Sequence, residues 1–251
     1  RDQLPYPKIK LPADKLTADL IKQGEYLTKA GDCVACHTVN GGEPFAGGLG
    51  IRTPFGTYYS PNITPSKKHG LGDWTEGDFI KAMKQGVSKD GGHLFPVFPY
   101  IYYSKVTDED LKAMWAYLQA VPASETPNKP IDALLPFRIR LSQFFWKLLF
   151  FDLYVTPFKP DGSKSTAWNR GAYLVEGLGH CSMCHTPLNL LGAPKRSLLF
   201  TGGYVDGYYA PNLTDSMLSM VTVKQITRVF YADELPGGGK VKGPMAQVNH
   251  D

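Results

Sequence analysis

The sequence has no long hydrophobic run and little cysteine, and each shortage excludes a class of protein. The most apolar stretch, FFWKLLFFDLYV at 144–155, is interrupted by Lys147 and Asp152, whereas a membrane-spanning helix needs about 20 apolar residues. Four cysteines in 251 residues are too few for a small scaffold held together by disulfides. The charge is nearly balanced, with 27 basic and 23 acidic residues, so we expect no nucleic-acid partner.

The chain does contain an internal repeat. The stretch GEYLTKAGDCVACHT at 24–38 corresponds to GAYLVEGLGHCSMCHT at 171–186. PFAGG and YYSPNIT follow the first stretch, and LFTGG and YYAPNLT follow the second. The offset is 147 residues at Gly24/Gly171, 148 at Cys33/Cys181 and 150 at Asn62/Asn212. Ordered similarity at a nearly fixed offset predicts two copies of one domain. We place the copies at 1–125 and 167–251, joined by a proline- and aromatic-rich connection at 126–166.

The secondary structure is predicted to be helical. Helices are expected at 17–31, 73–86 and 107–121, with Thr17, Thr75 and Thr107 as their N-caps. Strand signals are sparse, and the second copy has no counterpart of the 107–121 helix. We therefore expect the chain to be incomplete, or this helix to come from a neighbour. Short helices joined by long loops make a poor core, so we expect something other than side chains to fill the middle.

Every cysteine of the chain lies in a CxxC pair that is followed at once by a histidine. The two motifs are Cys33, Cys36 and His37 in the first copy and Cys181, Cys184 and His185 in the second. A thioredoxin-type CxxC would follow a strand in a βαβ unit, and no such unit precedes either motif. One zinc site would have to combine the cysteines of both copies, although each copy carries a complete motif. CxxCH is instead typical of covalent haem c attachment, so we predict two haem c groups.

The quoted motifs, together with TPFGTYYSPNIT at 53–64 and HLFPVFPY at 93–100, resemble the multihaem cytochrome c subunits of membrane-bound periplasmic dehydrogenases. Those dehydrogenases oxidise alcohols, aldehydes, gluconate and related sugars. The resemblance covers residues 17–251 and implies an all-α fold of two tandem class I cytochrome c domains. In each domain a few short helices would wrap around a covalent haem. The family typically has three haem domains, so a third domain or an anchor beyond residue 251 remains an open question.

The resemblance also implies a function. The chain would relay electrons from a dehydrogenase catalytic subunit toward quinone or another redox protein, in the periplasm and attached to the inner membrane. A dihaem enzyme of the peroxidase or thiosulfate dehydrogenase type is the alternative, with the first haem as its catalytic centre. It stays open because Phe98 stands where many relatives have methionine. The aromatic segment 137–155 is a candidate docking surface, or it packs between the domains.

A haem iron that transfers electrons needs a second axial ligand, and the two copies offer different ones. In the second copy the resemblance supports Met245, in GPMAQV. In the first copy Phe98 cannot bind iron. We favour Met83, within the predicted 73–86 helix, over His93 or an open coordination position.

Three further residues are candidates for contacts with haem. Asn62 and Asn212, in the paired PN(I/L)T loops, either donate hydrogen bonds near the haem edge or only form turns. Trp74 either contacts a propionate through its indole N–H or only packs.

Overall fold

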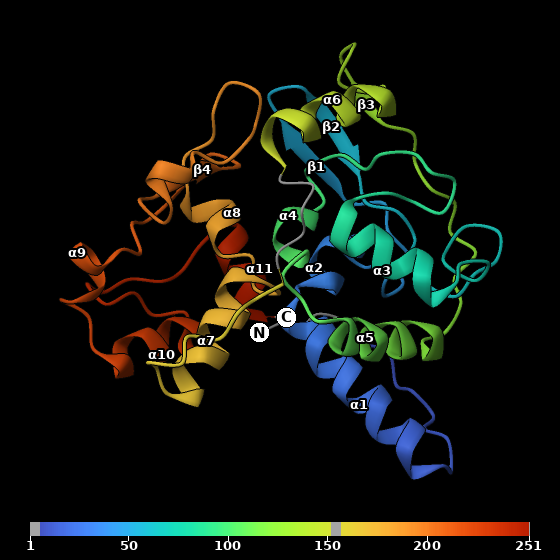
Figure 1. Cartoon of the computed structure of the whole chain (residues 1–251), viewed down its shortest axis with the longest axis horizontal. Coiled ribbons are helices and arrows are strands. Elements are labelled where there is room, and N and C mark those ends of the chain that lie inside the picture. Colours follow the sequence, from blue (N-terminus) through green and yellow to red (C-terminus); the bar gives the residue numbers. More distant parts are fainter. Residues whose placement is uncertain (1–5, 152–156, 251) are drawn as a thin grey trace. The chain divides into compact units, whose positions relative to one another are not determined.

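A computed structural model describes residues 6–151 and 157–250 of the chain. The chain divides into two compact units between His180 and Cys181, and Figure 1 shows their elements. Helices are the commonest regular elements of both units, in line with the predicted helices, but both units also contain short antiparallel strands. The fold therefore contains more β structure than the expected all-α class.

The N-terminal unit, residues 6–180, is built mostly from short helices. They are α1 (Lys15–Ala30), α2 (Cys33–His37), α3 (Glu76–Gln85), α4 (Tyr100–Tyr103), α5 (Asp108–Ala120), α6 (Arg140–Phe150) and α7 (Thr166–Glu176). Thr75 caps α3 and Thr107 caps α5, as predicted. The first helix begins earlier than expected. Asp14, not Thr17, is its N-cap, because the Asp14 carboxylate accepts a hydrogen bond from the Thr17 backbone N–H at 2.8 Å.

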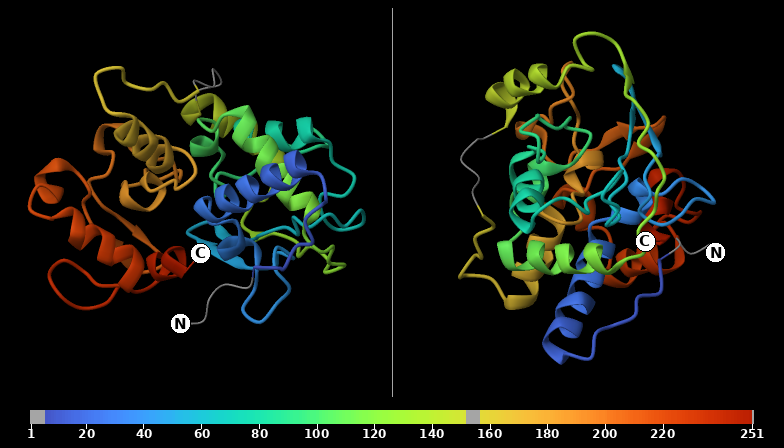
Figure 2. Two further views of the ribbon diagram at one scale, coloured as in Figure 1. Left: turned by 90° about the horizontal axis from the view of Figure 1, so that it is seen from below. Right: turned by 90° about the vertical axis from the view of Figure 1, so that its right-hand side faces the viewer.

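The core of this unit lies between α1 and α5, which pack against each other (Figures 1 and 2). Gly24 permits the close approach, because a Cβ at this position would lie 1.9 Å from the backbone oxygen of Ala113. Leu27, Leu111 and Met114 are fully buried nearby. Burial of each such side chain contributes about 1.5–3 kcal/mol, so this unit has a hydrophobic core made of its own side chains.

A small antiparallel sheet holds part of the proline-rich connection. Its strands, in the order β1-β2-β3, are β1 (Gly50–Thr53), β2 (Gly56–Tyr59) and β3 (Asp132–Ala133). Beyond β3, the backbone N–H of Leu134 donates to the Phe55 carbonyl at 3.0 Å. The rings of Phe55 and Phe137 stack with their centroids 4.2 Å apart. This part of the connection is therefore folded onto the sheet.

Helix α7 packs within the N-terminal unit, although the sequence repeat groups it with the second copy. The Tyr173 hydroxyl donates to the Asp110 carboxylate at 2.7 Å and accepts from the Thr107 backbone N–H at 3.1 Å. The compact N-terminal unit therefore extends through α7 to His180, just before the second CxxCH motif.

The C-terminal unit, residues 181–250, has shorter elements and little core. They are α8 (Ser182–His185), a 3₁₀ turn (Arg196–Leu198), the hairpin β4 (Gly203–Val205) and β5 (Tyr208–Ala210), α9 (Asp215–Leu218), α10 (Val223–Ala232) and α11 (Pro244–His250). Among the described residues of this unit, the buried hydrophobic ones are Ala193 and Val241. Larger side chains such as Tyr209 and Phe230 are exposed. The side chains of this unit alone do not close around a hydrophobic centre.

Candidate haem c attachment sites

Both CxxCH motifs fold as a turn of helix. Cys33, Cys36 and His37 lie in α2, and residues at i, i+3 and i+4 share one face of a helix. In the second copy, Cys181 has helical backbone angles at the start of α8. None of the four cysteines, all of them among the described residues, forms a disulfide. Each motif therefore presents two thiols and an imidazole on the same side, as attachment of haem c requires.

Each motif is preceded by a residue with left-handed backbone angles, Asp32 with φ 53° and His180 with φ 34°. Their side chains lie close together, with His180 Nε2 4.0 Å from Asp32 Oδ2. Burial raises the pKa of Asp32 to about 7 and lowers the pKa of His180 to about 4. Burial therefore favours the uncharged form of each group.

A backbone carbonyl orients the histidine of each motif. His37 Nδ1 lies 2.7 Å from the Pro61 oxygen, and His185 Nδ1 lies 2.7 Å from the Pro211 oxygen. Because a carbonyl can only accept, Nδ1 is the donor, and in the neutral ring Nε2 keeps its lone pair. Burial lowers the pKa of both imidazoles, which favours this neutral form. Both Nε2 atoms are thus suited to bind a metal ion.

The loop after each motif is built in the same way in the two units. Thr38 Oγ1 accepts from the Phe45 backbone N–H at 3.1 Å, and Thr186 Oγ1 accepts from the Phe200 N–H at 3.0 Å. Phe45 and Phe200 have φ angles of 62° and 61°. The repeat in the sequence is therefore also a repeat in local hydrogen bonding and backbone conformation.

Asn62 and Asn212 both form turns. Each side-chain oxygen accepts from the backbone N–H of the threonine two residues later, at 2.9 Å and 2.7 Å. Asn62 is buried, and its Nδ2 donates to the carbonyls of Ser124 and Thr126 at 2.8 Å and 3.1 Å. Both amide hydrogens of Asn62 are thus used inside the protein. This favours the turn-forming role over a hydrogen bond to haem at this position.

The predicted distal residues lie on several elements. Met83 is buried in α3, whereas Met245 is half-buried at the start of α11. Phe98 and Trp74 are half-buried in the loops that precede α4 and α3. No hydrogen bond or ring contact among the described residues joins these side chains to either CxxCH histidine, so their roles toward haem stay predictions.

His93 is engaged by α6. Its Nδ1 accepts a hydrogen bond from Lys147 Nζ at 3.1 Å, and its ring packs against Phe144 at 5.4 Å between centroids. When Nδ1 accepts, the hydrogen of the neutral ring sits on Nε2. This arrangement disfavours His93 as an iron ligand relative to Met83.

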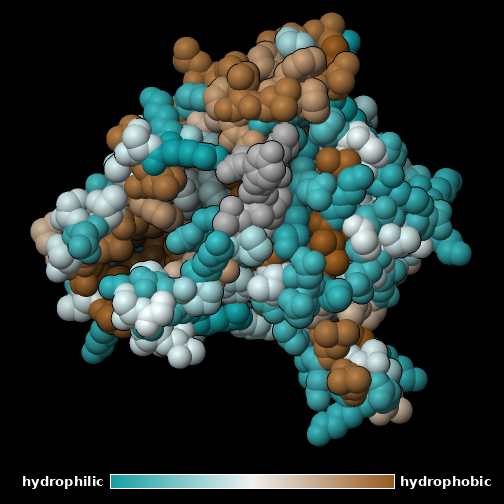
Figure 3. Space-filling model, in the orientation of Figure 1, coloured by the Kyte–Doolittle hydropathy of each residue, from teal (hydrophilic) through white to brown (hydrophobic). Residues whose placement is uncertain are grey.

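The donor set and its surroundings fit a covalent haem in both units. Among the described residues, no three His, Cys, Asp or Glu side chains form a site for a metal ion alone. The Tyr117 hydroxyl is buried and has no hydrogen-bond partner in the described part of the N-terminal unit. In the space-filling view, a hollow lined with hydrophobic residues opens over the C-terminal unit (Figure 3). A large apolar group held through two thiols and one imidazole matches these features.

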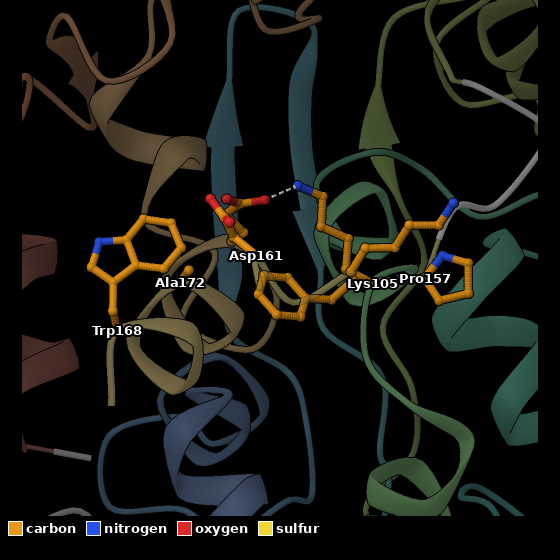
Figure 4. Close-up of a pocket in the computed structure, with 8 residues that line it drawn as sticks. Lys105, Pro157, Asp161, Trp168 and Ala172 are labelled. Carbon is orange, nitrogen blue, oxygen red and sulfur yellow. Dashed lines mark hydrogen bonds and ion pairs between the residues drawn. The ribbon is translucent and has the colours of Figure 1, made fainter. Parts of the chain in front are cut away.

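A separate pocket of about 330 Å³ lies in the N-terminal unit, between α7 and the segment 157–161 (Figure 4). Lys105 and Glu176 form an ion pair at its wall, and Trp168 also lines it. Its described lining contains no cysteine, histidine or methionine. The pocket is therefore not part of either candidate haem site.

Comparisons with known proteins agree with this chemistry. The family model described as cytochrome c matches residues 21–122. The gluconate 2-dehydrogenase cytochrome c subunit of Pantoea cypripedii is 44% identical over 81% of the chain, and the fructose dehydrogenase cytochrome subunit of Gluconobacter japonicus is 43% identical over 78%. The chain spans only 48% and 40% of the length of these two relatives.

A third relative is similar over most of both chains. The diheme cytochrome c-type protein of Cereibacter sphaeroides is 38% identical over 90% of this chain and 77% of its own length. Similarity of this extent, together with the two CxxCH turns and their oriented histidines, identifies the family. The chain belongs to the cytochrome c family, and haem c is the cofactor that this membership implies.

Proposed function

We propose that the chain is an electron-transfer cytochrome with two covalent haem c groups, which relays electrons from a dehydrogenase catalytic subunit toward quinone or another redox protein. The observation that carries the proposal is that in both CxxCH turns a carbonyl accepts from Nδ1 of the imidazole, which leaves the lone pair on Nε2 for an iron. Haem c supplies a one-electron centre. The partner class is supported by relatives that are named as cytochrome subunits of gluconate, fructose and alcohol dehydrogenases.

The proposal assigns roles to the predicted residues. Cys33 and Cys36 bind the first haem and Cys181 and Cys184 the second, each through thioether bonds. His37 and His185 bind the irons through Nε2, and the carbonyls behind them hold the ring planes. A buried methionine in the first copy supports Met83 as its distal ligand, and Met245 takes this role in the second copy.

The remaining roles concern the haem edge and the domain architecture. Asn212 and Trp74 lie near the haem edges, whereas Asn62 fixes the loop. In the haem-loaded chain the architecture is two tandem, mainly α-helical class I domains at 1–125 and 167–251, with 126–166 between them. The matched hydrogen bonds of the two loops support two copies of one domain.

We further propose a periplasmic location at the inner membrane, with the membrane contact provided by the chain or by its partner. A dihaem enzyme is not favoured, because the dehydrogenase relatives are named as subunits of larger enzymes. The first copy nevertheless has Phe98 where the resemblance leads us to expect methionine, so its distal ligand needs a direct test.

Haem attachment is tested with paired cysteine variants. The wild-type chain, expressed with a c-type haem maturation system, should retain two haems per chain after denaturation and extraction with acidified organic solvent. Cys33→Ala/Cys36→Ala and Cys181→Ala/Cys184→Ala should each retain one, measured by pyridine haemochrome absorbance per mole of chain. Haem that is extracted from the denatured wild type would refute the proposal.

The distal ligands are tested by spectroscopy. Met83→Leu and Met245→Leu should each remove about half of the methionine-to-iron charge-transfer band, because each removes one thioether ligand. Met114→Leu is the matched control, since Met114 is a buried core methionine on α5, and should leave the band intact. An unchanged band in Met83→Leu would leave the first iron with another ligand or an open position. Rapid binding of carbon monoxide to reduced wild type would then favour the enzyme alternative.

A further inference from the structure

Helix α6 carries hydrophobic residues on its outer face and polar residues on its inner face. Leu141, Phe145 and Leu149 are 66%, 59% and 70% exposed, and residues at i, i+4 and i+8 lie on one face of a helix. Gln143 and Lys147, by contrast, are only 5% and 1% exposed. A surface helix of a globular protein normally shows the reverse arrangement.

The segment before α6 enlarges this hydrophobic face. Leu134, Leu135 and Ile139 are exposed as well. In the space-filling view, hydrophobic residues gather over α6 and the neighbouring β3, at the top of the molecule (Figure 3). Continuous exposed hydrophobic surface of this kind marks an interaction site. We call the exposed side chains of residues 134–149 the α6 face.

The buried polar side of α6 is tied to the fold by Lys147. Its Nζ donates to the carbonyls of Gln85 and Gly86 at 2.6 Å and 2.5 Å and to His93 Nδ1 at 3.1 Å. The three hydrogens of an ammonium group are thus all used, and two of them satisfy carbonyls at the C-terminal end of α3. Burial lowers the pKa of Lys147 to about 8, so the cation is retained at neutral pH.

Arg140 fixes the first turn of α6 in the same orientation. It donates to the Asp90 carboxylate at 2.8 Å, to the Gly92 carbonyl at 2.7 Å and to the His93 carbonyl at 3.2 Å. Rotating α6 to bury its hydrophobic face would break these bonds, and a buried charge without its partners is strongly unfavourable. The exposure of the hydrophobic face is therefore imposed by the fold.

The chemistry of the α6 face favours lipid over protein as its partner. No Asp or Glu occurs in residues 133–151, and the charged residues there are Arg138, Arg140 and Lys147. Arg138 is exposed, while Arg140 and Lys147 are engaged as described above. The one hydroxyl of this stretch, on Ser142, donates to the Ile139 carbonyl at 2.7 Å. A specific protein interface carries about one hydrogen bond per 100–200 Å², and this face has little to offer for such bonds.

The dimensions of α6 suit a position on a membrane rather than across it. The helix has 11 residues, which corresponds to about 16 Å at 1.5 Å per residue, or roughly half of a hydrocarbon core. In the described parts of the chain, no helix is long and apolar enough to cross a membrane. Short helices with aromatic and aliphatic residues on one face, flanked by basic charge, lie in the interface of anionic membranes.

We propose that the α6 face docks the chain on the surface of an anionic lipid membrane, with the helix axis in the membrane plane. Leu141, Phe145 and Leu149 enter the boundary between headgroups and acyl chains, and Arg138 faces the lipid phosphates. This deepens the proposed attachment to the inner membrane and rests on that part of the proposed function. It does not depend on which protein donates electrons.

The test is co-sedimentation of the haem-loaded chain with vesicles, with bound protein measured on denaturing gels. Wild type should bind vesicles of phosphatidylglycerol and phosphatidylethanolamine, and bind phosphatidylcholine vesicles more weakly. Leu141→Gln/Phe145→Gln/Leu149→Gln should lower the partition coefficient roughly 100-fold, because three inserted side chains become polar. Arg138→Gln should lower it about fivefold on the anionic vesicles alone.

The matched control replaces three exposed hydrophobic residues outside the α6 face, as Leu16→Gln/Leu190→Gln/Val223→Gln. It should change vesicle binding by less than about twofold. Circular dichroism and haem content of each variant show whether it folds, and they separate this test from that of electron transfer. The proposal is overturned if wild type does not bind anionic vesicles, or if both triple variants bind equally. It is also overturned if the α6 triple variant only dissociates a dimer or a dehydrogenase complex.

Discussion

At the scale of single residues, burial raises the pKa of the Asp32 carboxyl next to the first candidate attachment motif. Its folded pKa of about 7 lies above that of an unfolded aspartate, about 4. A raised pKa stabilises the fold below the unfolded value, and the stabilisation is lost as pH rises through the folded value. His180, whose pKa is lowered to about 4, acts in the opposite sense between about pH 4 and 6.5.

Asp32→Asn isolates the contribution of this carboxyl. We compare the free energy of unfolding of Asp32→Asn with that of wild type. The difference, variant minus wild type, should increase between pH 5 and pH 8 by on the order of 2 kcal/mol, because only wild type must bury a charge at the higher pH. Guanidinium denaturation of the haem-loaded chain at both pH values measures the difference. Asparagine tolerates the left-handed backbone angles of this position. Any other effect of the substitution on the free energy of unfolding should therefore be the same at both pH values.

The control for this experiment is Asp14→Asn. Asp14 caps α1, and its hydrogen bonds with Thr17 lower its pKa, so its ionisation does not change above pH 5. The difference between this variant and wild type should stay constant from pH 5 to pH 8. If Asp32→Asn gives an equally flat difference, its carboxyl is not held protonated by burial.

The sequence predicted the side chains of the candidate attachment sites but not the groups that orient the two histidines. The Cys and His spacing is itself the chemical requirement of haem c, so it could be read directly. The carbonyls of Pro61 and Pro211 carry no side-chain signature, because any residue has a carbonyl. The only available signal was the repeated PN pair in both loops. The contact between Asp32 and His180 joins residues that are distant in the sequence, and no local pattern predicts it.

At the scale of elements, one glycine of the repeat serves a different role in each copy. Gly24 lets α1 approach the backbone of α5, whereas a Cβ at Gly171, the corresponding position of α7, would meet no atom within 4 Å. Gly24→Ala should destabilise the chain by about 1–3 kcal/mol, since the helices must separate. Gly171→Ala should stabilise it by up to about 1 kcal/mol through helix propensity. Thermal unfolding followed by circular dichroism compares the two, and equal effects would contradict the packing argument.

Elements with strong local signals were predictable, and those that depend on distant contacts were not. Thr75 and Thr107 mark helix starts because capping is local. The residue pattern of α6 shows that it is amphipathic. Which of its faces is buried, however, is set by Gln85, Gly86 and His93, which accept hydrogen bonds from Lys147. β3 has only two residues and forms because the connection returns to β2. Such a strand has no sequence signal of its own.

At the scale of the whole molecule, the repeat predicted two similar domains but not how differently they are stabilised. The N-terminal unit has a side-chain core between α1 and α5, while the described C-terminal unit buries few hydrophobic residues. We expected that side chains alone would not fill the core of the domains. This expectation thus describes the C-terminal unit better than the N-terminal one. The difference arises because α5 covers α1, and residues 181–250 contain no helix of that length.

With one haem in each unit, as proposed, this asymmetry predicts that the C-terminal unit depends on its haem for folding more strongly than the N-terminal unit does. In Cys181→Ala/Cys184→Ala, the amides of α10 and of the β4–β5 hairpin should exchange roughly 100-fold faster than in wild type. A unit of about 70 residues with so little buried hydrophobic area is not stable alone. In Cys33→Ala/Cys36→Ala, the amides of α1 and α5 should stay protected to within about tenfold, since Leu27, Leu111 and Met114 remain packed. Hydrogen exchange with mass spectrometry follows both units in each variant, with the haem content measured in parallel. Retained protection of α10 without the second haem would show that side chains alone hold this unit. Equal loss in α1 and α5 would show instead that the first core also forms around its cofactor.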